Sequence, residues 1–189
     1  LLLGEKPAAL VTHFGSSFWS LVPFTMQMAL VIVGGFVVAS SPPLARLIGR
    51  LGSLPKSPRS AVAFVALFSM LASLLSWGLS LVFTGLLVRE VARRVPRTDY
   101  RALGAAAYLG LGSVWALGLS SSAALLQASP QAIPAALLPV TGIIPLSQTI
   151  FLWQSLALAG TLVAVSVAVA WVSCPPPGRA RTPGEMGVR

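Results

Sequence analysis

The chain has very few groups that could support acid–base or metal chemistry. Its 189 residues include four Asp or Glu, one His and one Cys. A single Cys174 excludes a disulfide within the chain and leaves no zinc ligand set. A catalytic nucleophile needs a base within reach, and His13 is the only histidine available. We therefore expect no enzyme, no metal site and no bound cofactor.

Charge is also absent from long parts of the chain. Residues 61–88 and 102–178 contain no Asp, Glu, Lys, Arg or His. Apolar residues make up 56% of the chain and charged residues 9%, against roughly 45–50% and about 25% in soluble domains. Because a crossing helix needs about 20 apolar residues, the composition predicts an all-α polytopic membrane protein that contacts lipid.

The positive charge of the chain follows membrane topology. The net charge is +9, but the basic residues lie in short segments between apolar runs. Lys and Arg accumulate on the cytoplasmic side of membrane proteins, whereas a nucleic-acid-binding protein gathers them on one face. We therefore do not expect a nucleic acid as partner.

Residues 61–88 are predicted to enter the membrane and return to the same side. Lys56 and Arg59 precede this apolar stretch, and Arg89 follows it directly. Basic residues at both ends place both ends in the cytoplasm, so the stretch should be a re-entrant hairpin with its tip near Ser76. Irregular backbone at membrane depth needs shielding by protein or a cavity.

Residues 102–129 are predicted to form a second interrupted segment. Gly110, Gly112 and Gly118 stand close to the run of serines 120–122, and this density of small and polar residues favours an unwound centre over a uniform helix.

The other boundaries follow from the same pattern of charge, Pro and Gly. The first three residues are leucines without an initiating Met, so we expect the chain to be a piece of a longer protein. The expected order is an outer loop at 1–18 after a preceding helix, a transmembrane helix at 19–41, a cytoplasmic basic loop at 42–60, the hairpin at 61–88, a cytoplasmic basic segment at 89–101, the broken transmembrane helix at 102–129, an outer loop at 130–148, a transmembrane helix at 149–173 and a cytoplasmic linker at 174–189.

Three local patterns predict specific contacts. Gly35 offers a flat surface for close helix approach. Glu90 and Arg94 have the spacing of an i,i+4 ion pair. Either Thr98 or Asp99 can cap the helix that starts at Tyr100.

The two interruptions are the candidate binding site. An interrupted helix exposes N–H groups and a partial positive charge that attract a carboxylate, and its free carbonyls can ligate Na⁺. The alternative is that the serines bond to their own helices and that Trp77 only fills space. The candidate residues are Ser76, Trp77, Gly78, Ser80, Gly118, Ser120, Ser121 and Ser122.

An anionic solute at these interruptions needs charge balance from outside the protein. Neither segment has a fixed cation, so a co-transported Na⁺ or proton is the natural inference. A membrane subunit that transports nothing and a passive anion channel remain as alternatives.

Several stretches resemble the bacterial short-chain fatty acid transporter family, within the wider ion transporter superfamily. They are residues 18–21, 26–33, 39–42, 76–78, 89–96, 99–100, 107–108 and 120–126. The resemblance implies ion-coupled uptake of butyrate- or acetoacetate-type acids across the inner membrane of a bacterium, in a multi-pass protein.

The same resemblance implies the architecture of the whole transporter. This chain would be the N-terminal repeat of an inverted pair in an elevator-like secondary transporter, with a C-terminal repeat of the same protein as its partner and a homodimer left open. Three residues depart from the family pattern: Ser76 stands where Asn is usual, and Leu117 and Ser121 stand where glycines are usual. The replacement of glycine by Leu117 and Ser121 should reduce backbone freedom at the second interruption.

Overall fold

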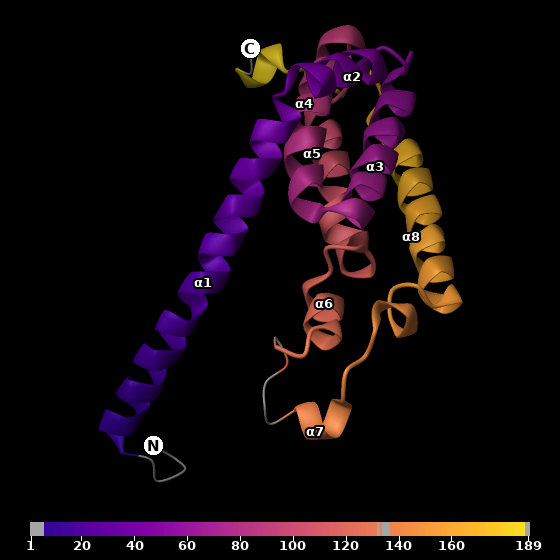
Figure 1. The fold of residues 1–189 in the computed structure, drawn as a ribbon. Coiled ribbons are helices and arrows are strands. Elements are labelled where there is room, and N and C mark those ends of the chain that lie inside the picture. The colour runs from indigo at the N-terminus through magenta and orange to yellow at the C-terminus, as the bar shows by residue number, and fades with distance from the viewer. Residues whose placement is uncertain (1–5, 132, 134–136, 188–189) are drawn as a thin grey trace.

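The computed structural model describes residues 6–187 except 132 and 134–136. All regular elements in this part of the chain are helices (Figure 1). They are α1 (Pro7–Ala39), α2 (Pro42–Gly52), α3 (Pro58–Leu75), α4 (Trp77–Arg94), α5 (Tyr100–Leu109), the π-helical η1 (Gly110–Val114), the 3₁₀ turn η2 (Trp115–Leu117), α6 (Ser122–Ala128), α7 (Leu138–Thr141), η3 (Leu146–Gln148), α8 (Trp153–Val172) and η4 (Gly184–Met186).

Four helical stretches of the described chain are long and apolar enough to cross a membrane. They are Pro7–Val38, Pro58–Leu75, Tyr100–Ala128 and Trp153–Val172. α4 is not among them, because its last turns carry the charged run 89–94. The expectation of an all-helical protein with several membrane-spanning segments is supported.

The core lies where α3, α4 and α5 pack together. Val65, Leu87, Val91 and Leu103 are completely buried there, and α8 contributes Ala170 to the same cluster. By contrast, α1 exposes apolar side chains along most of its length, and its N-terminal half leans away from the other helices (Figure 1).

Residues 7–18, expected as a loop, are the first turns of α1. Pro7 stands in the first turn, where a missing N–H costs nothing. Thr12 and Ser16 donate their hydroxyls to carbonyls one turn earlier, so these polar residues do not interrupt the helix. At about 1.5 Å per residue the 33 residues of α1 extend about 50 Å, well beyond a hydrocarbon core of about 30 Å.

The loop expected over 42–60 also contains a helix. α2 begins with two prolines and buries Ile48 and Gly52, and its polar face carries Arg46 and Arg50. The 11 residues of α2 are too few to predict a helix from sequence alone, because most of the stability of a short helix comes from packing.

The remaining expected loops contain short helical turns. α7 and η3 lie within 130–148, and η4 lies within 174–189. The final membrane helix α8 begins at Trp153, four residues later than expected. A 3₁₀ turn and a bend at Pro145–Leu152 take up those residues, with Phe151 donating its N–H to Leu146.

Basic residues gather at one end of the bundle. Every Lys and Arg between Arg46 and Arg181 lies in α2, at the basic end of α3, α4 or α5, in the short connections α2–α3 and α4–α5, or after α8. Figure 1 shows these segments together at the top, whereas α6, α7 and the N-terminus lie at the bottom. The Glu90–Arg94 ion pair expected at this end is confirmed, with 2.6 Å between Oε1 and Nη2.

Candidate functional site

The helical hairpin reverses at a single residue. Ser76 ends α3 and caps α4 with an extended backbone (φ −155°, ψ 118°), and its hydroxyl accepts the N–H of Leu79 at 3.4 Å. Its own N–H and C=O remain bonded to Ala72 and Ser80. The tip is therefore a tight turn in which both backbone groups of Ser76 are bonded, and Ser76 itself is half-buried.

The two arms of the hairpin are joined by a buried serine. The Ser80 hydroxyl donates to the Ser69 carbonyl at 2.8 Å, and Phe68 stacks on Phe83 with ring centroids 6.4 Å apart. Residues 68 and 69 therefore face residues 83 and 80, as they must in an antiparallel pair. Ser80 was expected in the solute site, but its hydroxyl instead makes a hydrogen bond that joins the two arms.

The second interruption follows α5 in three steps. The helix widens to π geometry over Gly110–Val114, tightens to a 3₁₀ turn at Trp115–Leu117 and becomes extended at Gly118 (φ −97°, ψ 173°). Ser121 is buried and restarts the helix by accepting the N–H of Ala124 at 3.3 Å. Ser122 is the exposed first residue of α6. The interruption predicted from the glycines and serines is present.

The two interruptions lie against each other. The N–H of Leu119 donates to the carbonyl of Leu74 at 2.8 Å, and the N–H of Trp77 donates to the hydroxyl of Ser120 at 3.0 Å. Gly118 makes this approach feasible, because a Cβ there would lie 2.6 Å from the Leu74 oxygen. Hydrogen bonds between the two breaks thus satisfy the carbonyl of Leu74 and the N–H groups of Trp77 and Leu119.

Helix α1 closes one side of the tip. Gly35 faces Gly78, and a Cβ built on Gly35 would lie 3.4 Å from the Gly78 oxygen. The close approach expected of Gly35 is present, and it brings α1 onto the start of α4. Gly78 is consequently buried.

A buried serine on α3 occupies the widened part of α5, and the sequence analysis missed it. The Ser69 hydroxyl donates to the carbonyl of Ala107 at 2.5 Å and accepts the N–H of Gly110 at 2.9 Å. A side chain inserted between carbonyl and N–H groups of a helix opens its hydrogen-bond ladder, and π segments often mark functional sites. Gly110 lies so close to Ser69 that any Cβ would overlap it.

A second missed serine is fully buried and has no partner. Ser73 exposes none of its surface, and its hydroxyl makes no hydrogen bond within the described chain. It lies one turn beyond Ser69 on the same face of α3, towards the tip. Such a group normally indicates a water, an ion or a ligand that completes the site. The spacing of Ser69, Ser73, Ser76 and Ser80 was the available signal.

Titratable groups lie away from these interruptions. His13 is on the exposed part of α1, and no three His, Cys, Asp or Glu side chains of the described residues could jointly hold a metal ion. Cys174 is buried just after α8, and burial raises the pKa of its thiol. The interruptions can therefore offer hydroxyls, peptide N–H groups and carbonyls to a solute.

The family model and the curated relatives that match this chain carry the same description. The model of the short chain fatty acid transporter family matches residues 1–181. A protein of Escherichia coli (strain K12) named "Putative short-chain fatty acid transporter" is 36% identical over 176 residues, which are 93% of this chain and 39% of that protein. A protein of the same name from Haemophilus influenzae is 33% identical over 186 residues, 96% of this chain and 41% of that protein.

These matches concern only part of the relatives. The chain spans about two fifths of the length of the curated proteins it matches. No solved structure matches it significantly.

Proposed function

Because the chain belongs to the short-chain fatty acid transporter family, we propose that its protein moves short-chain monocarboxylates of the butyrate and acetoacetate type across the cytoplasmic membrane by ion-coupled secondary transport. The family is named for transport and not for an enzymatic reaction, in agreement with the expectation of a non-enzymatic protein. In this proposal the chain contributes one re-entrant hairpin and one broken helix to the transport site.

The distribution of charge supports the re-entrant arrangement. α3 and α4 both have their basic ends at the top of the bundle in Figure 1, and the tip where α3 meets α4 lies towards the middle. With the basic end in the cytoplasm, the tip stands within the membrane. The backbone there is shielded by α1 through Gly35 and by the second interruption through Gly118, as membrane depth requires.

The carboxylate of the substrate would bind at the start of α4. The N-terminus of the 18-residue α4 carries partial positive charge that attracts anions. The N–H groups of Trp77 and Leu79 are already bonded to Ser120 and Ser76, so side-chain hydroxyls would make the direct contacts with the carboxylate. The hydroxyls of Ser76 and Ser122 lie at the two interruptions and can donate to a carboxylate oxygen. Trp77 is half-buried beside them and offers an apolar surface for the short alkyl chain.

The coupling ion would occupy the space in front of Ser73. Its hydroxyl is buried without a partner, and Na⁺ is commonly held in transporters by unwound carbonyls. The adjacent segment of η1 and η2 supplies such carbonyls, because the helix changes there from π to 3₁₀ to extended geometry. A cation here offsets the charge of the acid, because residues 61–88 and 102–178 carry no fixed charge.

The other part of the site would come from sequence beyond this chain. Inverted repeats of secondary transporters commonly place one interrupted helix from each half around a shared site near the membrane midplane. The present chain covers about two fifths of its relatives, which leaves room for a second repeat. Movement of such a unit across the membrane would give an elevator-like mechanism.

The observation that carries the proposal is the direct pairing of the two interruptions. Two hydrogen bonds, Leu119 to Leu74 and Trp77 to Ser120, hold an anion-attracting helix start beside an unwound backbone. Neither bond would be needed to pack two uninterrupted helices.

Uptake by proteoliposomes containing the full-length protein tests the proposal. Inward Na⁺ and proton gradients are imposed separately. We expect labelled butyrate or acetoacetate to accumulate above equilibrium under one of them. Uptake that only equilibrates would indicate a passive channel. Uptake equal to that of protein-free vesicles under both gradients would indicate a membrane subunit that transports nothing.

A further inference from the structure

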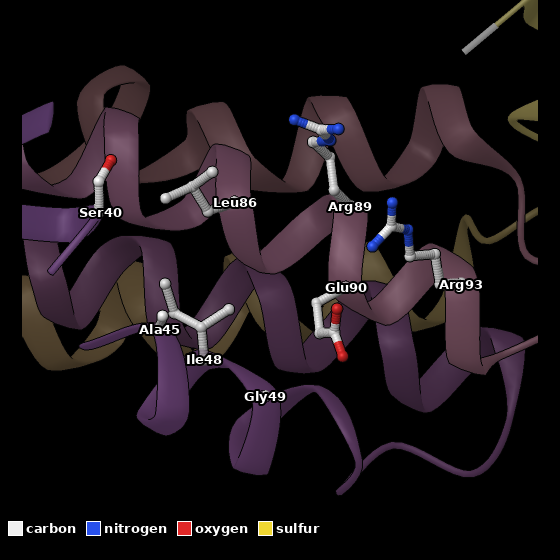
Figure 2. A pocket seen from close by; sticks show the side chains of 8 residues that line it. All are labelled: Ser40, Ala45, Ile48, Gly49, Leu86, Arg89, Glu90 and Arg93. Carbon is white, nitrogen blue, oxygen red and sulfur yellow. The ribbon is translucent and has the colours of Figure 1, made fainter. Parts of the chain in front are cut away.

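A cavity of about 380 Å³ lies between α2 and α4 at the basic end of the bundle (Figure 2). One molecule of liquid water takes about 30 Å³, so the cavity can hold a much larger group. It is distant from the interruptions described above, because it lies at the base of the hairpin. Its lining residues are Ser40, Ala45, Ile48, Gly49, Leu86, Arg89, Glu90 and Arg93.

The charged part of the cavity favours an anion. Arg89 and Arg93 are one turn apart on α4 and so share a face. Figure 2 shows both guanidinium groups on one side and the Glu90 carboxylate directed towards α2. Glu90 is already paired with Arg94 at 2.6 Å. Together with Arg94, which pairs with Glu90, Arg89 and Arg93 give this end of α4 a net positive charge. Guanidinium groups bind phosphate well.

Apart from Ser40, the remaining lining is apolar and leads towards the membrane. Leu86 lies about 10 Å below Arg93 along α4, and Ile48 faces it from α2. The last turns of α1 next to the cavity expose Phe36, Val37 and Val38 by 57%, 63% and 52%. A soluble anion matches only the arginines, whereas a lipid with an anionic head and apolar chains matches both parts.

We propose that this cavity binds the phosphate head group of an anionic phospholipid. Arg89 and Arg93 contact the phosphate, and the acyl chains follow Leu86 and the exposed end of α1. Basic pockets between helices on the cytoplasmic side commonly take such head groups. α2 fits this setting, since an amphipathic helix with Arg46 and Arg50 on its polar face suits a membrane surface.

This proposal depends on the membrane placement and not on the transported solute. The lipid would join α2 to the base of α4, and α2 directly precedes the hairpin. Failure of lipid binding and failure of butyrate uptake are therefore separate results in separate experiments.

Native mass spectrometry of the full-length protein in detergent tests the site. Phosphatidylglycerol and phosphatidylcholine are added at equal concentration, and bound lipid is counted. We expect preferential retention of phosphatidylglycerol, lost in the double variant Arg89→Gln with Arg93→Gln. Loss of two cations near an anionic lipid should weaken binding roughly 25-fold. Equal retention of the two lipids by the unaltered protein overturns the proposal.

Two further variants separate the cavity from the general charge of this end. Gly49→Leu keeps every charge and fills the cavity; no atom lies within 4 Å of a Cβ at this position, and Leu is a better helix former than Gly. It should also lose phosphatidylglycerol. Lys56→Gln with Arg59→Gln removes the same charge outside the cavity and should retain it. Retention by Gly49→Leu, or equal loss in the Lys56 and Arg59 variant, overturns the proposal.

A soluble phosphate distinguishes the lipid from a free anion. sn-Glycerol 3-phosphate carries the same phosphate without acyl chains. If the lipid is the occupant, this compound at the lipid's concentration leaves bound phosphatidylglycerol unchanged. Displacement of the lipid at equal concentration would assign the cavity to a small phosphate compound and would contradict the lipid proposal.

Discussion

Asp99 accepts a hydrogen bond from the backbone N–H of Arg181, 82 residues later in the chain, at 3.0 Å. The N–H of Tyr100 donates back to the carbonyl of Arg181 at 2.8 Å. Asp99 also caps α5 by accepting the N–H groups of Arg101 and Ala102, which decides between the two caps expected from the sequence. One carboxylate therefore joins the start of α5 to the segment that follows α8.

Removing this carboxylate should destabilise the protein and release the segment after α8. We expect Asp99→Ala to lower the free energy of unfolding by about 1 to 2 kcal/mol, the cost of a lost helix cap. Thermal unfolding of the full-length protein in detergent measures it, and limited proteolysis should cut residues 174–187 faster. Arg179→Ala, which removes an exposed side chain in the same segment, is the control, and an equal effect there would contradict this role of Asp99.

The same contact predicts a dependence on pH. The side chain of Arg101 chiefly holds the pKa of Asp99 well below its usual range, burial acts in the opposite direction, and the N–H groups of Arg181 and Ala102 lower the pKa further. A carboxyl with a lowered folded pKa stabilises the protein above its unfolded pKa of about 3.9. The stability difference between the unaltered protein and Asp99→Asn should be constant above about pH 5 and shrink as the pH falls below about 4. A difference that grows on acidification would contradict it.

Gly118→Ala should separate the two interruptions. Its new Cβ would lie 2.6 Å from a backbone oxygen of Leu74, which cannot move as a flexible side chain could. Overpacking of this kind costs about 1 to 3 kcal/mol, and we expect loss of uptake together with lower thermal stability. Gly104→Ala is the matched control, because a Cβ there meets nothing within 4 Å. Unchanged uptake by Gly118→Ala would show that the contact does not matter for transport.

Ser76→Ala and Ser122→Ala should each weaken apparent affinity for the acid. Loss of a hydrogen bond to the charged carboxylate costs about 1 to 3 kcal/mol, which is roughly a 5- to 150-fold rise in the half-saturating concentration. Uptake measured over a range of butyrate concentrations tests it, with the exposed Ser53→Ala as control. Unchanged kinetics in both variants would assign these hydroxyls to helix packing.

Ser73→Ala distinguishes an ion ligand from a packing residue. Removing a buried hydroxyl without a partner is neutral or stabilising for the fold. We therefore expect an unchanged or higher unfolding temperature together with at least a roughly tenfold higher half-saturating concentration of the coupling ion, equivalent to about 1.4 kcal/mol. A variant with unchanged ion dependence would exclude Ser73 as a ligand.

Labelling of introduced cysteines tests the direction of the hairpin. Lys56 and Arg97 flank α3 and α4 and are exposed, and Val140 is 82% exposed at the opposite end. In a protein with Cys174→Ala, we expect Lys56→Cys and Arg97→Cys to react with an impermeant maleimide only from the cytoplasmic side. Val140→Cys should react only from the outer side. Labelling of the first two positions from opposite sides would contradict the re-entrant arrangement.

The interruptions could be predicted because their signals are local. Ser76 lies midway through an uncharged stretch with basic residues at both ends, and Gly118 stands beside three serines. The residues that join them were harder to find. Ser69 reaches Gly110 only through the register of α3 against α5, 41 residues apart, and no local pattern encodes that register.

The helices missed at 7–18 and 42–52 have a related cause. Hydroxyls and prolines near α1 and α2 are typical of loops, but Thr12 bonds within its own helix and the prolines stand at the first turns. Burial of Ile48 then stabilises α2. Local propensity could not show these tertiary contacts.

The turn at Ser76 holds no spare length of chain. Only this residue lies outside α3 and α4, and its N–H and C=O are both engaged. Opening at the tip would therefore require a whole helix to rotate about its base, because α3 and α4 are not separated by a loop that could change its conformation. The speed of that step would be set by the packing at the far end of the hairpin.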